Sequence, residues 1–224
     1  MKDFKHYILT RFNTMHLDDE GSLLYDDKEK ADEWMTERMK LFVKTKESVL
    51  AQEGDFEWII SVDKRTPKKF MDKIKGDNIK IVHGDIRDVF LSGTIKPDTD
   101  WVITTRFDND DIYLPDAVLG IQERFEPKLK VIDIDFKKLE SKTGRYYPSE
   151  WKWQNSPFIS LIEPSDRVLT AFCRPHGQVW NGYPSGSLTG TYPAGKVAIK
   201  IKRERIEKVL VVQVIHGNNL ANIL

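Results

Sequence analysis

Residues 101–111 read WVITTRFDNDD, an apolar strand that runs directly into four polar residues. In open parallel sheets, ligands bind outside the carboxyl ends of the strands. Asp108 and Asp110 are separated by one residue, so both carboxylates can reach a single hard cation. Mg²⁺ and Mn²⁺ prefer oxygen ligands and often complete their shells with substrate phosphates. The run equally suits a turn, with Asp111 capping the helix that follows.

On both sides of this strand, apolar runs alternate with helical patterns. Strands are expected at 6–12, 56–62, 80–83 and 130–136, and helices at 28–52, 66–74 and 114–125. The run 130–136 alternates apolar and charged residues, which is typical of a half-exposed strand. Alternating strands and helices predict a parallel sheet that is covered on both faces. The expected fold class is α/β, with a Rossmann-like, mixed and mostly parallel central sheet flanked by helices.

The second half of the chain has a different character. Short strands are expected at 158–162, 167–173 and 208–215. Residues 175–195 are rich in Gly and Pro, which is typical of a long loop that shapes or covers a ligand. Neither an internal repeat nor a linker is visible, so the sequence predicts a single domain, 1–224.

Composition narrows the class of protein. The chain has 35 Lys plus Arg and 35 Asp plus Glu, and this zero net charge argues against nucleic-acid binding. A lone cysteine, Cys173, excludes an internal disulfide and a cysteine-based zinc cluster. No apolar run reaches the length of a membrane span, and the first residues lead into a strand without a secretory leader. We therefore expect a cytoplasmic protein without a membrane span.

Two further strand ends carry polar residues at what should be the same edge of the sheet. Asp63 closes the strand at 56–62 and could accept hydrogen bonds from a ribose or a base; it equally suits a turn that caps the next helix. Arg11 ends the first strand, and its fixed fork of donors suits a diphosphate. The alternative is an arginine that simply lies on the surface.

Glu163 and His216 end two strands of the second half. Glu163 lies between an apolar run and a proline, where partial desolvation would raise its pKa and suit a general base. His216 could be a third metal ligand beside two carboxylates. Each is also an ordinary residue for a strand end. Flat apolar faces that suit sugar rings are offered by Trp151, Trp153, Trp180 and Tyr183, with core or subunit contacts as the alternative.

Five stretches of the chain together resemble a known family. HYILTRFN, WIISVDKRTP, ITTRFDNDD, NSPFISLIEP and VQVIHGNN are similar to the rhamnosyltransferase family of bacterial glycosyltransferases, which is similar in turn to the family-two glycosyltransferases with the GT-A fold. The resemblance covers most of the chain. It implies transfer of a sugar, in this family rhamnose, from a nucleotide sugar with the help of Mn²⁺ or Mg²⁺. It also implies a nucleotide-sugar half at 1–126 and an acceptor half at 127–224.

The resemblance assigns roles residue by residue. Asp108 and Asp110 match the Asp-x-Asp pair, so Asp110 would bind the metal directly, while Asp108 would hold the ribose or a metal-bound water. His216 would approach the metal or the diphosphate. Glu163 matches the position of the acceptor-deprotonating base. The residues expected to contact the nucleotide sugar are Arg11, Asn13, Asp63, Arg106, Asp108 and Asp111, and those expected to contact the acceptor are Trp153, His176 and Trp180.

The expected activity is an inverting, metal-dependent transfer of a sugar to a glycan or lipid-linked acceptor. A GT-A-like carbohydrate-binding protein without turnover is the main alternative. A sugar nucleotidyltransferase would normally carry a Gly-rich, Arg-containing phosphate loop after its first strand, and residues 11–21 lack one. A glycoside hydrolase would use two carboxylates that flank a sugar. A peripheral membrane contact and a homodimer are open alternatives for the partners.

Overall fold

The computed structural model describes residues 3–14, 24–149, 156–173, 183–184, 198–199 and 201–216. Within these ranges the helices are α1 (Lys28–Leu50), α2 (Lys68–Ile74) and α3 (Ala117–Gln122), with short 3-10 turns η1 (Leu24–Asp26), η2 (Ile86–Asp88) and η3 (Ser165–Arg167). The strands are β1 (Phe4–Arg11), β2 (Glu57–Val62), β3 (Ile79–His83), β4 (Trp101–Arg106), β5 (Ile112–Tyr113), β6 (Lys130–Glu140), β7 (Tyr146–Pro148), β8 (Ile159–Pro164), β9 (Tyr183–Pro184), β10 (Ala198–Ile199) and β11 (Lys202–Ile215).

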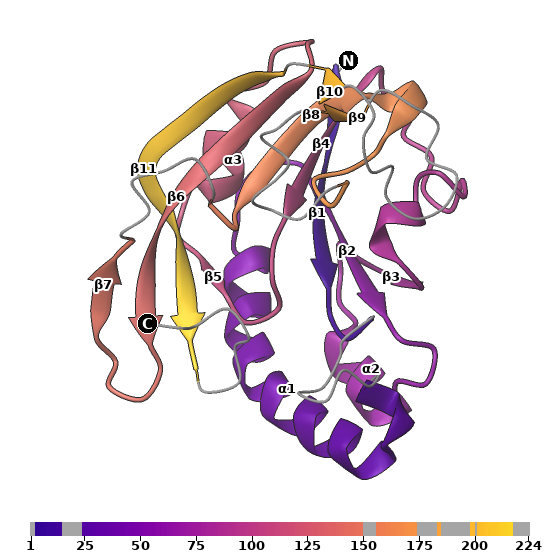
Figure 1. Ribbon diagram of the computed structural model, residues 1–224, viewed down its shortest axis with the longest axis vertical. Helices are drawn as coiled ribbons and strands as arrows, with labels where there is room; N and C mark the ends of the chain where they lie inside the picture. The colour runs from indigo at the N-terminus through magenta and orange to yellow at the C-terminus, as the bar shows by residue number, and fades with distance from the viewer. Residues whose placement is uncertain are drawn as a thin grey trace.

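One large twisted sheet forms the centre of the structure (Figure 1). Its strand order is β3-β2-β1-β4-β8-β6-β11-β5, with β7 paired to β6; β9 and β10 form a separate pair. Strands β1 to β4 are mutually parallel, and β8 runs antiparallel to both of its neighbours, β4 and β6. Since β11 is parallel to β6, β5, β7 and β8 are the strands that oppose the common direction among those that the structure describes in this sheet. The expected fold class, α/β with a mixed and mostly parallel sheet, is confirmed.

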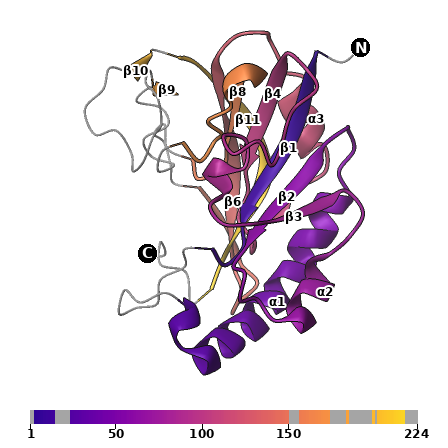
Figure 2. The same cartoon turned by 90° about the vertical axis from the view of Figure 1, so that its right-hand side faces the viewer.

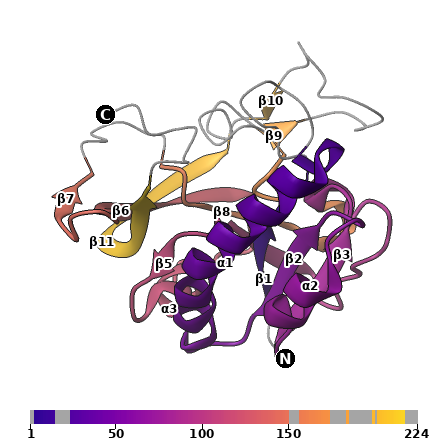
Figure 3. The same ribbon diagram turned by 90° about the horizontal axis from the view of Figure 1, so that it is seen from below.

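The three α-helices all lie on the same side of this sheet (Figures 2 and 3). Ile8, Ile60 and Ile103 point from β1, β2 and β4 into the core beneath these helices. The alternate residues point to the opposite face, where η2 and the segment 168–173 cover them. The sheet is therefore covered on both faces, as expected, but only one of the covers is helical.

Helix α1 shows how the sequence produces the helical cover. Asp27 caps its first turn by accepting hydrogen bonds from the backbone N–H groups of Glu29 and Lys30, at 2.9 and 3.1 Å. Its buried stripe recurs at helical spacing and contains one charged member; the stripe consists of Ala31, Met35, Arg38, Met39, Phe42, Thr45 and Val49. Within the described residues, no helix is long and apolar enough to cross a membrane.

Two of the differences between expected and observed elements concern the segment 168–173 and helix α3. Residues 168–173 do not form a strand; instead they follow η3 and pack against the sheet through side chains such as Leu169 and Phe172. The helix expected at 114–125 is shorter, and it is preceded by Asp116 in the left-handed conformation, with φ 66°. The division of function at residue 126 stays a prediction.

Candidate functional site

The carboxyl ends of β1, β2 and β4 meet at one edge of the sheet. Arg11 ends β1, Asp63 follows β2, and Arg106 ends β4 with Asp108 just beyond it. Parallel pairing of β1 with both β2 and β4 fixes this arrangement. The structure therefore brings Arg11, Asp63, Arg106 and Asp108 to the same edge of the sheet, while their contact with a nucleotide stays a prediction.

Two arginines converge at this edge on one aromatic ring. The guanidinium carbons of Arg11 and Arg106 lie 4.9 and 4.8 Å from the centroid of the Phe172 ring. Burial lowers the pKa of Arg11, and the positive charge of Arg106 lowers it further. An arginine stays protonated in proteins, so the two side chains hold two positive charges close together.

The arginine pair is incompletely neutralised by the protein. Arg106 is 8% exposed, and its buried Nε atom has no hydrogen-bond partner among the described residues. The nearest Asp108 oxygen lies 3.7 Å from that Nε atom, within ion-pair range but beyond a good hydrogen bond. A buried donor without a partner is costly, and a bound anion would satisfy it. The pair is thus suited to a phosphate or diphosphate group.

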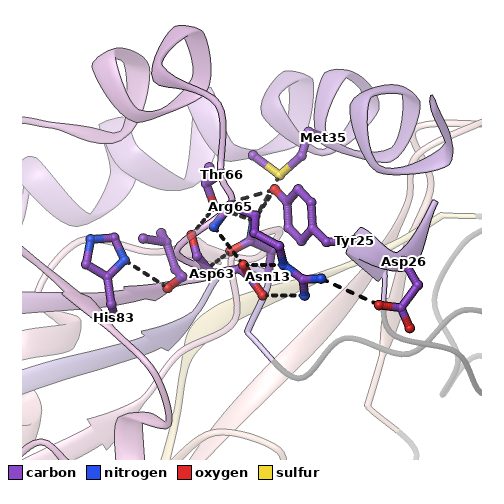
Figure 4. A network of polar contacts seen from close by, with 9 residues as sticks. Asn13, Tyr25, Asp26, Met35, Asp63, Arg65, Thr66 and His83 are labelled. Atoms are coloured by element: carbon purple, nitrogen blue, oxygen red, sulfur yellow. Dashed lines mark hydrogen bonds and ion pairs between the residues drawn. The ribbon is translucent and has the colours of Figure 1, made fainter. Parts of the chain in front are cut away.

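Asn13 forms buried hydrogen bonds that hold this edge of the sheet together (Figure 4). Its Oδ1 atom accepts a hydrogen bond from the backbone N–H of Asp63 at 2.9 Å, and its Nδ2 atom donates to the hydroxyls of Tyr25 and Thr66 at 2.7 and 3.0 Å. The amide therefore ties the end of β1 to the end of β2. Asn13 is buried and occupied by protein groups, so a direct contact with a nucleotide stays a prediction.

Asp63 is held by its neighbour Arg65 (Figure 4). Its Oδ1 atom accepts hydrogen bonds from the backbone N–H and the Nε of Arg65, at 2.8 and 3.0 Å, and its Oδ2 atom accepts from Nη2 at 3.0 Å. The side-chain hydrogen bond from Arg65 lowers the pKa of Asp63 against the effect of burial. The carboxylate is therefore ionised at neutral pH and pre-oriented at the edge.

A second charged cluster lies around Asp110, between α1 and the end of β11. The Oδ2 atom of Asp110 contacts the guanidinium of Arg38 and lies 2.8 Å from Nε2 of His216. An ionised carboxylate only accepts, so His216 carries its proton on Nε2. Burial alone would raise the pKa of Asp110, but the His216 hydrogen bond and the charge of Arg38 hold it below its usual value. Asp110 and His216 therefore lie together, while the metal-binding role expected for them stays a prediction.

The side chains around Asp110 do not fit the expected Mn²⁺ or Mg²⁺. Arg38 already occupies the Oδ2 atom that a cation would bind, and Asp108 is paired with Arg106 instead. A divalent ion at this oxygen would be repelled by the adjacent guanidinium, so it could bind there only by displacing Arg38. In the part of the chain that the structure describes, no group of three or more His, Cys, Asp or Glu side chains could hold a metal ion.

Asp111 is buried inside the protein. The Oδ1 atom of Asp111 accepts a hydrogen bond from the backbone N–H of Val214 at 2.9 Å, so this side chain joins its loop to β11 and does not cap α3. Burial raises the pKa of Asp111, and the charge of Asp110 raises it further. Because Asp111 is only 3% exposed, a contact with the nucleotide sugar stays a prediction.

The expected position of Glu163 is wrong. Because β8 is antiparallel to β4, Glu163 pairs with Val102 at the start of β4, at the edge opposite Asp110. The side chain is fully buried, and its oxygens accept hydrogen bonds from the backbone N–H groups of Leu169 and Thr170, each at 2.8 Å. These contacts make Glu163 an anchor for the segment 168–173, and it cannot meet an acceptor at the Asp110 edge.

Some expected residues cannot be placed, and two residues at the edge were not expected. Trp153, His176 and Trp180, the predicted acceptor contacts, lie outside the described residues. The unexpected residues are Arg38 and Phe172. A charged residue three positions after Met35 on the apolar stripe of a helix is a signal that could have identified Arg38; no comparable signal marks Phe172.

The sequence matches no protein-family model and no curated protein. Among solved structures, the chain is similar to 4-diphosphocytidyl-2C-methyl-D-erythritol synthase from Anaerococcus prevotii, with 11% identity, a TM-score of 0.38 and 70% of each chain covered. It is also similar to a CMP:2-keto-3-deoxy-manno-octonic acid synthetase in complex with CTP, with 12% identity, a TM-score of 0.34, and 77% of this chain and 78% of that chain covered. The inositol-1-phosphate CTP transferase from T. maritima shows 9% identity and a TM-score of 0.35, with 94% and 89% covered.

All three TM-scores lie below 0.5, so these likenesses do not establish a shared activity. Membership of the rhamnosyltransferase family stays a prediction.

Proposed function

We propose that the protein binds a nucleotide sugar at the carboxyl edge of β1 and β4 and transfers its sugar to a glycan or lipid-linked acceptor. The observation that carries the proposal is the arginine pair, Arg11 and Arg106, which converges on Phe172. The buried Nε atom of Arg106 has no hydrogen-bond partner within the part of the chain that the structure describes. Asp63 supports the same proposal, because an oriented carboxylate at the neighbouring strand end suits the N–H or hydroxyl donors of a nucleoside.

The arginines would act on the leaving group. Transfer of the sugar releases a nucleoside diphosphate, whose negative charge grows as the glycosidic bond breaks. Fixed positive charges that face this developing charge stabilise the transition state more than the ground state. Arg38 forms an ion pair with Asp110 where the sequence predicts a divalent ion, so this pair adds no net positive charge of its own. Rhamnose as the sugar, the identity of the acceptor, a homodimer and a peripheral membrane contact stay predictions.

The experiment is a thermal-shift panel with dTDP, UDP, GDP and CDP on the full chain. A ligand at about 100 times its dissociation constant adds about 2.7 kcal/mol of stability, which gives a measurable rise in melting temperature. We expect one base to give the largest rise and Arg106→Gln to reduce it by about half or more. The matched control is Arg124→Gln, which changes an arginine near the start of β6 at the opposite edge and should keep the rise.

The result decides between the proposal and its alternatives. A rise that is equal in wild type and Arg106→Gln would contradict the arginine pair as the binding site. No rise with any nucleotide, in folded protein, would overturn the proposal and favour a carbohydrate-binding protein. Release of nucleoside diphosphate from the matching nucleotide sugar then separates a transferase from a protein that binds without turnover.

A further inference from the structure

Asp133 is a buried carboxylate on the same face of the sheet as the arginine pair. Its neighbours in β6, Ile132 and Ile134, point into the core beneath the helices. Side chains alternate along a strand, so Asp133 points to the opposite face. On that face Arg106 contacts Phe172, and the adjoining core includes Val131 of β6.

Strand register places Asp133 level with Arg106. Thr105 of β4 pairs with Ser160 of β8, which sets the next residue, Arg106, beside Ile159. Ile159 pairs on its other side with Asp133. Neighbouring strands are about 4.8 Å apart, so the backbones of Arg106 and Asp133 are separated by about 10 Å, with Ile159 between them. A ligand that reaches from the arginines to the Asp133 carboxylate would pass over the side chain of Ile159, which points to the same face.

Asp133 has an oxygen that the described protein does not satisfy. The residue is 4% exposed, and its Oδ1 atom is buried without a hydrogen-bond partner among the described residues. The hydroxyl of the nearby Ser156 donates to the backbone oxygen of Ile134 at 2.8 Å. Arg205 of β11 donates to the neighbouring Asp135 at 3.2 Å. An unsatisfied acceptor in this position suits a hydroxyl donor from a ligand.

The charges around Asp133 favour a proton acceptor that works near neutral pH. Burial raises the pKa of Asp133 to about 6, and the charge of Asp135 adds to that rise. The charge of Arg205 and hydrogen bonding from Ser156 and from the backbone of Ile134 oppose it. A general base is most effective when its pKa lies near the working pH. By contrast, Glu163 is saturated with protein hydrogen bonds at the far edge.

We propose that Asp133 is the general base that deprotonates the acceptor hydroxyl, an inference that rests on the proposed function. The acceptor oxygen forms a bond to the anomeric carbon while the bond from that carbon to the diphosphate oxygen breaks. The acceptor proton passes to a carboxylate oxygen of Asp133. The electron pair of the broken bond leaves with the nucleoside diphosphate, whose charge lies against Arg11 and Arg106. Attack from the side opposite the diphosphate inverts the anomeric carbon.

The test compares wild type, Asp133→Asn and Asp135→Asn. The probe is the nucleotide sugar whose base gives the largest thermal shift, with water as the acceptor, and the readout is released nucleoside diphosphate between about pH 5 and pH 8. In wild type the rate should rise as the pH passes through about 6 and then level off. Asp133→Asn should lose about 100-fold or more of the rate and its pH dependence, while keeping the nucleotide thermal shift.

Asp135→Asn is the matched control, because it removes the neighbouring carboxylate on the same strand. It should keep the maximal rate and move the rise to lower pH, since the charge of Asp135 raises the pKa of Asp133. Asp133→Asn with an unchanged rate and profile overturns this inference and leaves the proposed function standing. Wild type that binds the nucleotide but releases no diphosphate at any pH overturns the inference together with the transfer step. If the wild-type protein does not bind any of the nucleotides, the proposed function itself is overturned.

Discussion

Replacing Asp133 by Asn should stabilise the protein at neutral pH. The folded-state pKa of Asp133 is raised to about 6 from 3.8. A raised carboxyl pKa means that the folded state binds the proton more tightly, so stability is highest below about pH 4 and is lost as the pH rises to about 6. The difference of 2.2 units corresponds to about 3 kcal/mol at 1.36 kcal/mol per unit. Asn is neutral and nearly isosteric with Asp, so the variant does not undergo this pH-dependent loss of stability.

The assay is urea unfolding of wild type and Asp133→Asn at about pH 4 and about pH 8. The two proteins should have similar stability at the lower pH, and the variant should be more stable by up to about 3 kcal/mol at the higher pH, or about 6–12 °C in melting temperature. Other buried groups, such as His6, whose pKa burial lowers to about 3, titrate in both proteins and cancel in the difference. A variant that is less stable at both pH values would refute the assignment of an unsatisfied, buried Asp133.

Three further predictions follow from the contacts of Arg38 and Glu163. Arg38→Met should cost about 3–5 kcal/mol in urea unfolding, because it leaves the buried Asp110 carboxylate without its cation. Glu163→Gln should cost about 1–3 kcal/mol, because an amide has one oxygen for the two backbone N–H groups that the carboxylate accepts, and it should leave the nucleotide thermal shift unchanged. Chelation by EDTA should not reduce that thermal shift, because Arg38 already occupies the Asp110 oxygen that a metal would bind; a thermal shift that requires Mn²⁺ would contradict this.

The periodicity of the sequence and the polar residues at the ends of strands predict much of the sheet edge at which we propose that the nucleotide binds. The run WVITTRF forms β4, and Arg11, Asp63 and Arg106 meet at one edge because β1, β2 and β4 are parallel. Asp110 and His216, 106 residues apart in sequence, meet because both residues follow strands that run in the same direction, while their predicted metal-binding role stays a prediction. Local sequence carries this information because parallel strands place all their carboxyl ends together.

The position of Glu163 could not be predicted, because an apolar run indicates a strand without indicating its direction. The antiparallel course of β8 moves its end to the opposite edge. Asp133 was missed for a related reason. Its alternating strand is typical of one that exposes its charged face, yet the segment 168–173 and the neighbouring strands bury that face. Arg38 was missed because a single charge on a helix is normally solvated, and only the tertiary fold places it on Asp110.

Calorimetric titration of wild type and Arg106→Gln tests the central claim most directly, with the best nucleoside diphosphate and the matching nucleoside as ligands. Arg106 should contribute a charge-assisted hydrogen bond of about 1.5–3 kcal/mol, so the variant should bind the diphosphate about 10- to 100-fold more weakly. The nucleoside should bind much more weakly than the diphosphate to wild type, and its affinity should be unchanged by the substitution. Equal affinity of wild type for the two ligands, or an unchanged diphosphate affinity in Arg106→Gln, would contradict a diphosphate site on the arginine pair.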